Sequence, residues 1–180
     1  IEIDKKRIIS STEALALGQI PEHLMVVGGG VIGVEIGSVF ARLGSKVSIV
    51  EYFDSLIATM DGALGHQLHR SLRKQGIDFY LEHKVTNATA TDGKVELKAE
   101  NLSDKEEMSL EGDYCLMAIG RKPYIASLGL ENIGVKTNEK GQVTVDKNLE
   151  TNVKDVYAIG DVIRGAMLAH KASEEDVFVA

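Results

Sequence analysis

Three glycines in one short stretch are the residues with the clearest chemical meaning. Gly28, Gly30 and Gly33 follow the spacing G-x-G-x-x-G, directly after the apolar residues 24–27 and at the start of residues 31–43. The apolar run predicts a buried strand, and the longer segment predicts a helix. In this pattern the first glycine makes a tight turn, the second lets backbone approach a phosphate, and the third lets the helix pack closely on the sheet. The stretch therefore predicts a pyrophosphate site at the positive end of a helix.

An acidic residue follows at the distance that a dinucleotide site requires. Residues 46–50 predict a second strand, and Glu51 comes directly after it, 23 positions beyond Gly28. A carboxylate there accepts hydrogen bonds from the 2′-hydroxyl of an adenosine ribose and repels a 2′-phosphate. Because no Arg stands beside it, the sequence predicts NAD rather than NADP. The alternatives are an ordinary glycine turn and a solvated carboxylate at the end of a strand.

The elements around this stretch predict an α/β fold with a Rossmann-like parallel sheet. Residues 61–75 have a helical pattern that places Leu64, Leu68 and Leu72 on one face. Residues 77–81 then predict a third strand. Strand, helix, strand, helix and strand in this order form half of a doubly wound sheet.

A different pattern follows the third strand. Residues 84–90, 94–100 and 107–111 alternate between apolar and polar side chains, with short turns between them. This spacing predicts a β-meander, which we expect to cover one face of the parallel sheet. Residues 114–119 are apolar and predict one more strand, which ends before Gly120.

The character of the chain changes again near residue 121. We predict that residues 1–121 form an NAD-binding domain and that residues 122–180 form part of an FAD-binding central domain. The second part is rich in loops, with a run at 156–160 that predicts a buried strand ending in Gly-Asp. A helical pattern begins at residue 166.

Composition excludes several classes of protein. The 180 residues are 44% hydrophobic and carry a net charge of −7, which predicts a globular core and argues against a nucleic-acid partner. No apolar run approaches the roughly 20 residues of a membrane span, and the first residues lack the layout of a signal peptide. Since the first residue is not Met, we expect a piece of a longer protein.

Other reactive side chains carry weaker signals. Cys115 is the only cysteine and lies in an apolar strand pattern, so we expect a buried core residue in a reducing compartment, the cytoplasm. His66 and His69 could share a metal ion, but without further ligands nearby we expect solvated helix residues and no metal site. The acidic residues 174–176 are expected to be a solvated charge run.

Four stretches together resemble the FAD-dependent pyridine nucleotide–disulfide oxidoreductases. They are the glycine stretch with Glu51, the sequence AIGRKP at 118–123, the sequence TNVKDVYAIGD at 151–161, and the sequence GAMLAHK at 165–171. The last is most similar to the lipoamide (dihydrolipoyl) dehydrogenase branch. The match spans nearly the whole chain.

The resemblance implies an NAD site. Glu35 would lie near the nicotinamide and the flavin, Glu51 would hold the ribose, and Val85 would lie by the adenine. The implied NAD-binding residues are Gly28, Gly29, Gly30, Val31, Ile32, Gly33, Val34, Glu35, Glu51, Val85 and Gly120.

The resemblance also implies part of an FAD site. Asp161 would bond the ribityl chain, and backbone at a helix N-terminus would approach the flavin ring. The implied ring-binding residues are Met167, Leu168, Ala169 and His170. Taken alone, Gly160 and Asp161 would indicate only a turn followed by a helix cap.

The implied activity is the oxidation of dihydrolipoamide, with electrons passing through a disulfide and FAD to NAD. The implied parent is a homodimer whose partner is the lipoyl domain of a 2-oxo acid dehydrogenase complex. The chain has no second glycine fingerprint, no cysteine pair and no C-terminal His–Glu base. We therefore assign no catalytic residue and expect the chain alone to be inactive.

Two other functions stay open at this point. One is the same region of another NAD-linked flavin disulfide reductase, because residues that face the substrate would lie outside the chain. The other is a non-catalytic module that senses NAD(H).

Overall fold

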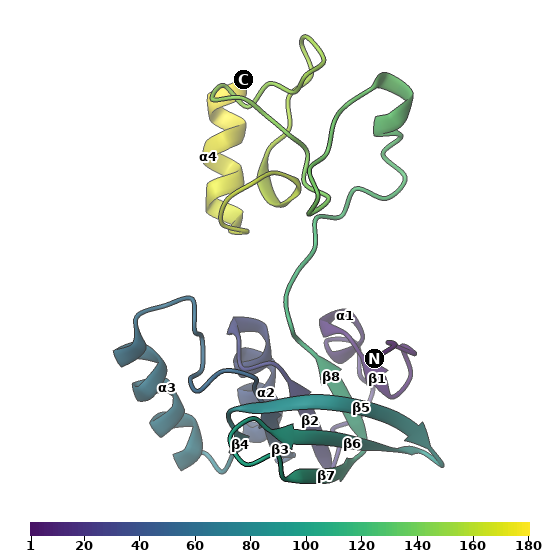
Figure 1. The fold of residues 1–180 in the computed structure, drawn as a ribbon, viewed down its shortest axis with the longest axis vertical. Helices are drawn as coiled ribbons and strands as arrows, with labels where there is room; N and C mark the ends of the chain where they lie inside the picture. The colour runs from purple at the N-terminus through teal and green to yellow at the C-terminus, as the bar shows by residue number, and fades with distance from the viewer. The chain divides into compact units, whose positions relative to one another are not determined.

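The computed structural model describes residues 1–180. The chain forms two compact units, Ile1–Gly120 and Arg121–Ala180, and each is described by itself (Figure 1). The first unit contains both sheets, and the second contains one α-helix and irregular chain.

A five-stranded parallel sheet is the centre of the first unit. Its strand order is β1-β8-β2-β3-β4, and every neighbouring pair is parallel. The strands are β1 (Ile8–Ile9), β2 (His23–Val27), β3 (Lys46–Val50), β4 (Asp78–Tyr80) and β8 (Tyr114–Met117). In register, Val27 faces Val50 on one side and Met117 on the other, so the carboxyl ends of three strands meet at one edge. The predicted α/β fold is confirmed.

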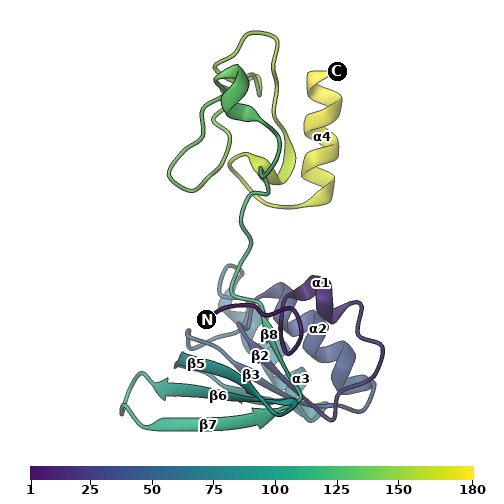
Figure 2. The same ribbon diagram turned by 90° about the vertical axis from the view of Figure 1, so that its right-hand side faces the viewer.

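Three helices cover one face of this sheet (Figure 2). They are α1 (Ser11–Ala14), α2 (Val31–Arg42) and α3 (Gly62–Lys74). Ser10 and Glu13 form a capping box at α1, and the Asp61 side chain accepts from Ala63 N at the start of α3. The core on this face contains Leu24, Val26, Ala14, Val34, Phe40, Val47, Ile49, Leu72 and Leu116.

An antiparallel meander covers the opposite face, as predicted (Figure 2). It consists of β5 (His83–Thr91), β6 (Lys94–Asn101) and β7 (Glu107–Gly112) in sequential order. Asp92 and Gly93 both have positive φ, which is the conformation that the tight turn between β5 and β6 requires. Alternate residues of β6 are buried against the parallel sheet, and the core between the two sheets contains Val95, Leu97, Ala99, Met25, Val27, Val50 and Cys115.

The second unit has a small core and little regular structure. It contains two short 3-10 helices, η1 (Leu130–Ile133) and η2 (Gly160–Val162), and the helix α4 (Ala169–Val179). Val135, Val143 and Ile163 are its buried core. The prediction of a buried strand at 156–160 is wrong, because Tyr157 is 46% exposed and forms only an isolated bridge. A strand needs a neighbour, and these residues have none to form a ladder with.

The structure differs from the sequence prediction at two further places. Strand β1 was not predicted, because two residues are too few to show the alternation of apolar and polar side chains that indicates a strand. Leu64 was expected beside Leu68 and Leu72, but it is 57% exposed. The contact at that end of α3 is made by Gly65, where a Cβ would lie 2.7 Å from the Leu56 carbonyl oxygen, so Leu64 faces away from the sheet.

Candidate cofactor-binding sites

The turn between β2 and α2 is held close to the end of β8. Gly28 N donates to Val50 O at 2.9 Å, and Ala118 N donates to Val27 O at 2.8 Å. Gly28 has φ +108°, and a Cβ on it would lie 2.5 Å from Ala118 O. Only glycine fits this close approach of two strand ends. The arrangement places the start of the glycine stretch at the carboxyl edge of the sheet, where open α/β sheets bind ligands.

The N-terminus of α2 presents free backbone donors. Gly30 is the N-cap and provides no side-chain cap, and the first helical bond runs from Val34 N to Gly30 O at 3.0 Å. The N–H groups of Val31, Ile32 and Gly33 therefore have no acceptor within the helix. A Cβ on Gly30 would meet nothing within 4 Å. An anion such as a pyrophosphate can approach this backbone without a steric obstacle.

The third glycine has a structural role in the same turn. A Cβ on Gly33 would overlap the Gly28 carbonyl oxygen and would lie 3.2 Å from the Val26 side chain. Gly33 thus permits α2 to start directly above the end of β2, as the spacing predicted. Because of this packing, the N–H groups at the start of α2 lie at the carboxyl edge of the sheet.

Glu51 is buried and bonded on both carboxylate oxygens. It is 8% exposed, Oε1 accepts from Phe53 N at 2.8 Å, and Oε2 accepts from Gly29 N. The alternative of a solvated carboxylate is therefore wrong. Because each oxygen has a second lone pair, the carboxylate can still accept a hydroxyl donor while it orders the glycine loop.

The other residues implied in the NAD site differ in their exposure and packing. Gly120 has φ +138° with open space where a Cβ would be. The start of β5 is joined to the site, since His83 N donates to Glu51 O at 2.9 Å, but the Val85 side chain packs in the core between the sheets. Glu35 is exposed on α2, whereas Val34 is buried and uses its N–H within the helix.

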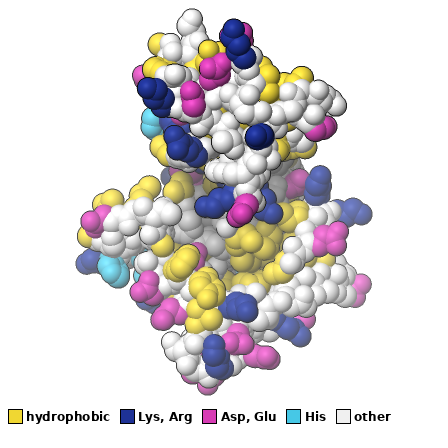
Figure 3. Space-filling view, turned by 45° about the horizontal axis from the view of Figure 1, so that its top comes forward, with side chains coloured by type: hydrophobic (Ala, Val, Ile, Leu, Met, Phe, Trp, Pro, Cys, Tyr) yellow, Lys and Arg dark blue, Asp and Glu magenta, His cyan; other side chains and the backbone are white.

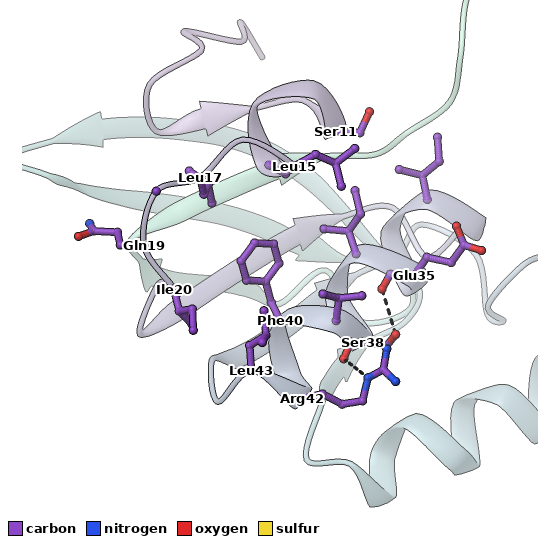
Figure 4. A pocket seen from close by; sticks show the side chains of 15 residues that line it. Ser11, Leu15, Leu17, Gln19, Ile20, Glu35, Ser38, Phe40, Arg42 and Leu43 are labelled. Atoms are coloured by element: carbon purple, nitrogen blue, oxygen red, sulfur yellow. Dashed lines mark hydrogen bonds between the residues drawn. The ribbon is translucent and has the colours of Figure 1, made fainter.

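A pocket of about 810 Å³ lies beside the same helix, between α2 and the segment that contains α1 (Figure 4). Figure 4 shows apolar side chains from both segments lining it, among them Leu15, Ile20, Phe40 and Leu43. Glu35 is also part of its lining. The sequence pattern did not predict this pocket, since its two walls come from separate segments.

The residues implied in flavin binding come together in the second unit. Asp161 lies in η2 with its side chain 49% exposed, and its Oδ2 is 3.1 Å from Arg121 Nη1. Leu168 is the N-cap of α4 without a side-chain cap, and the first helical bond runs from Ala172 N to Leu168 O. The N–H groups of Ala169, His170 and Lys171 are therefore free, as a helix N-terminus facing a flavin would require.

Sequence reasoning missed two side chains beside Asp161. Arg121 bonds both the Asp161 carboxylate and the Met167 carbonyl oxygen. Glu175 was expected in a solvated charge run, but its side chain is only 16% exposed and accepts from Gly160 N at 2.8 Å. The spacing of Lys171 and Glu175 could have indicated an i,i+4 ion pair. The contact between Glu175 and Gly160 joins residues 15 positions apart, so no local sequence pattern indicates it.

Other reactive residues are structural in this arrangement. Cys115 is fully buried between the sheets, and burial raises the pKa of its thiol to about 12. His69 is not solvated as expected. Its ring packs edge-on against Phe79, with ring centroids 4.7 Å apart.

Acidic and basic side chains are interspersed on the face drawn in Figure 3. The net charge of −7 agrees with this distribution. None of the helices combines the length and apolar character needed to cross a bilayer.

The fold and the glycine loop define a dinucleotide-binding protein, and comparison with known proteins gives its family. Residues 2–175 match the pyridine nucleotide-disulphide oxidoreductase family. The chain belongs to this family of oxidoreductases, whose cofactors are the NAD and FAD that the resemblance implied.

Individual relatives support the same assignment. The chain is 46% identical over 177 residues to the mitochondrial dihydrolipoyl dehydrogenase of Pisum sativum, covering 98% of this chain and 35% of the relative. It is also 46% identical to the leghemoglobin reductase of Glycine max, covering 98% of this chain and 34% of that protein. The chain thus spans about a third of the length of these curated relatives.

A solved structure shows the same architecture. The HOCl-induced flavoprotein disulfide reductase RclA of Escherichia coli matches with a TM-score of 0.83 and 35% identity. The match covers 93% of this chain and 37% of that one.

Proposed function

We propose that this chain is the NAD-binding region and part of the FAD-binding region of a dihydrolipoyl dehydrogenase. Residues 1–121 would be the NAD-binding domain, and residues 122–180 would belong to the central FAD-binding domain. The observation that carries the proposal is the glycine loop, where free N–H groups of α2 lie next to the buried carboxylate of Glu51. The 46% identity to a dihydrolipoyl dehydrogenase over 98% of the chain supports it.

The loop geometry favours NAD(H) over NADP(H). The pyrophosphate would accept from the free N–H groups of Val31, Ile32 and Gly33, and open space at Gly30 would allow its approach. Glu51 would accept from the ribose hydroxyls. A 2′-phosphate at the same place would meet a buried negative charge, which is unfavourable at short distance.

The second unit would supply part of the flavin site. Asp161 would accept from ribityl hydroxyls, and the free N–H groups at the start of α4 would stabilise negative charge near the flavin ring. When bound, FAD would carry electrons between a disulfide and NAD. The residues Met167, Leu168, Ala169 and His170 would contribute backbone there.

The substrate and partners are proposed on the relatives alone. The parent would oxidise dihydrolipoamide on the lipoyl domain of a 2-oxo acid dehydrogenase complex and would be a homodimer. The single cysteine, Cys115, is buried with a thiol pKa of about 12 and cannot exchange with a dithiol. A free buried thiol also suits a reducing compartment such as the cytoplasm. We expect no NADH formation from dihydrolipoamide by the 180-residue chain, and measurable turnover would contradict this.

A second candidate is the same region of a different flavin disulfide reductase. The names of two relatives favour it, since one is a leghemoglobin reductase and another is a flavoprotein disulfide reductase. Both candidates share the NAD site. Turnover of the longer parent with dihydrolipoamide, compared with other disulfide substrates, distinguishes them.

Calorimetric titration of the chain with NAD⁺, NADH and NADPH tests the proposal. We expect NAD(H) to bind more tightly than NADPH, and Glu51→Gln to reduce this preference at least about tenfold, because it removes the negative charge while an oxygen can still accept from the loop. Glu96→Gln is a control on the exposed face of β6. Equal affinity of wild type for NADH and NADPH would contradict the role of Glu51, and no binding of either would contradict the NAD site.

A further inference from the structure

One guanidinium joins the start of the second unit to two nearby points of the segment that leads into α4. Arg121 Nη1 lies 3.1 Å from Asp161 Oδ2, and Arg121 Nη2 donates to the carbonyl oxygen of Met167. These partners follow Arg121 by 40 and 46 positions. The planar fork of Arg can satisfy both acceptors at once, which a lysine ammonium does with less geometric definition. Arg121 therefore fixes the orientation of the Asp161 carboxylate relative to the segment that enters α4.

A second contact fixes the turn that carries Asp161. Glu175 lies on α4, and its Oε2 accepts from Gly160 N at 2.8 Å. Lys171 Nζ lies 2.6 Å from Glu175 Oε1, and the two side chains are only 23% and 16% exposed. The Lys171 ammonium beside it and the hydrogen bond from Gly160 N lower the pKa of Glu175. The residue before Asp161 is thus bonded to a helix side chain.

The end of the turn is held by Val143 N, which donates to Val162 O at 2.8 Å, but its start has little local support. The 3-10 helix Gly160–Val162 has three residues, and its backbone bond from Ile163 N to Gly160 O is long at 3.4 Å. Gly160 has φ +71°, and a Cβ there would lie 3.2 Å from Ala172 Cβ. The turn is therefore pressed against α4, and the Glu175 bond is what orients its first peptide.

We propose that Arg121 and Glu175 are positioning residues for Asp161. Arg121 orients the carboxylate through Oδ2 and leaves Oδ1 to accept from a hydroxyl, while Glu175 fixes the turn that presents it. Such an oxygen can accept from a hydroxyl donor of a bound ligand. The identity of that donor as the ribityl chain of FAD rests on the proposed function, whereas the positioning itself does not.

Hydrogen exchange of the 180-residue chain without ligand tests the role of Glu175. We expect Glu175→Ala to raise the exchange rate of Gly160 about tenfold, because a charge-assisted hydrogen bond is lost. Glu175→Gln should have a smaller effect, since its amide oxygen can still accept. The matched control is Glu174→Gln, an exposed neighbour with the same change of charge. Unchanged exchange at Gly160 in Glu175→Ala would overturn the role of Glu175.

The same measurement, with an FAD titration, tests the role of Arg121. Arg121→Ala should raise exchange over residues 165–169, and Arg121→Lys should rescue it in part. In the longer parent, flavin fluorescence should show FAD bound about tenfold more weakly by Arg121→Ala, with the NAD⁺ affinity and the melting temperature unchanged. Unchanged exchange in Arg121→Ala, or FAD affinity equal to that of wild type, would overturn the proposal for Arg121. If the longer parent fails to bind FAD, the proposed flavin role fails, while the exchange data on the 180-residue chain still decide the positioning.

Discussion

At the scale of single residues, the three fingerprint glycines have separable roles. Gly30 lines open space at the start of α2, whereas Gly33 contacts backbone of the same turn. A substitution at Gly30 should therefore change the affinity for a ligand, and a substitution at Gly33 should change the stability of the fold. The G-x-G-x-x-G motif thus contains one glycine whose role is in ligand binding and one whose role is in packing.

We predict that Gly30→Ala leaves stability within about 1 kcal/mol of wild type and weakens NADH binding at least about tenfold. The added methyl has room in the protein, but it occupies the space through which a phosphate would reach the backbone. Urea unfolding and calorimetry measure the two quantities. Weaker stability with unchanged NADH affinity would contradict this division.

The matched variant is Gly33→Ala, which we expect to destabilise the first unit by about 1–3 kcal/mol. Its Cβ would overlap the Gly28 carbonyl oxygen, and backbone on both sides must shift. Urea unfolding measures the loss. A stability equal to that of wild type would show that α2 can move away from β2 at no cost.

Burial also decides the chemistry of the one thiol. Because the pKa of Cys115 is raised to about 12 by desolvation, almost no thiolate exists at neutral pH. We predict that Cys115 does not react with a thiol reagent such as dithionitrobenzoate in the folded chain and reacts fully in denaturant. Rapid reaction in the native state would contradict the assignment of Cys115 to the core.

At the scale of elements, a polar cluster joins the amino-terminal end of β2 to the meander. His23 Nδ1 lies 2.7 Å from Glu111 O, and His23 Nε2 lies 2.9 Å from the hydroxyl of the fully buried Ser48. A neutral ring donates from Nδ1 and accepts at Nε2, so it satisfies both partners. Asp113 accepts from His23 N at 2.9 Å and completes the junction.

Stability should therefore fall as this histidine becomes charged. Desolvation by burial lowers the pKa of His23, so the unfolded chain binds the proton more readily than the folded one. The free energy of unfolding should decrease as the pH falls below about 6.5, the usual value for an unfolded histidine. Urea unfolding at pH 7.5 and 5.5 measures it. A decrease of the same size in His23→Gln would rule out His23 as the source, and exposed His66→Gln is the control.

Local patterns predicted most of the first unit and less of the second. The parallel strands around the glycine loop and the meander have clear periods and turn residues, and their positions agree with the sequence prediction. The run at 156–160 has strand composition but no partner strand, which composition cannot reveal. The contact between Glu175 and Gly160 depends on how α4 packs, so no spacing in the sequence indicates it.

At the scale of the whole molecule, the first unit contains its own cores. Both the helix-covered face and the meander-covered face of the parallel sheet are formed within residues 1–120. A segment with two complete cores and a closed set of strand pairs meets the requirements of an independent domain. The proposed dinucleotide site lies within it.

We predict that residues 1–120 fold alone and bind NADH within about threefold of the affinity of the 180-residue chain, because the loop, Glu51 and the start of β5 are all retained. Circular dichroism and calorimetry measure folding and affinity. An unfolded or aggregated segment would show that residues 121–180 are needed for the fold.

A residue-resolved NMR titration of the 180-residue chain with NADH tests whether the glycine loop binds the dinucleotide. We predict that the largest amide shifts occur at residues 28–34, with further shifts at Glu51 and at the start of β5. Amides of α3 and of the turn between β5 and β6 should stay unchanged. Shifts confined to the pocket between α1 and α2, or spread without a centre at the glycine loop, would contradict the claim that this loop binds the dinucleotide.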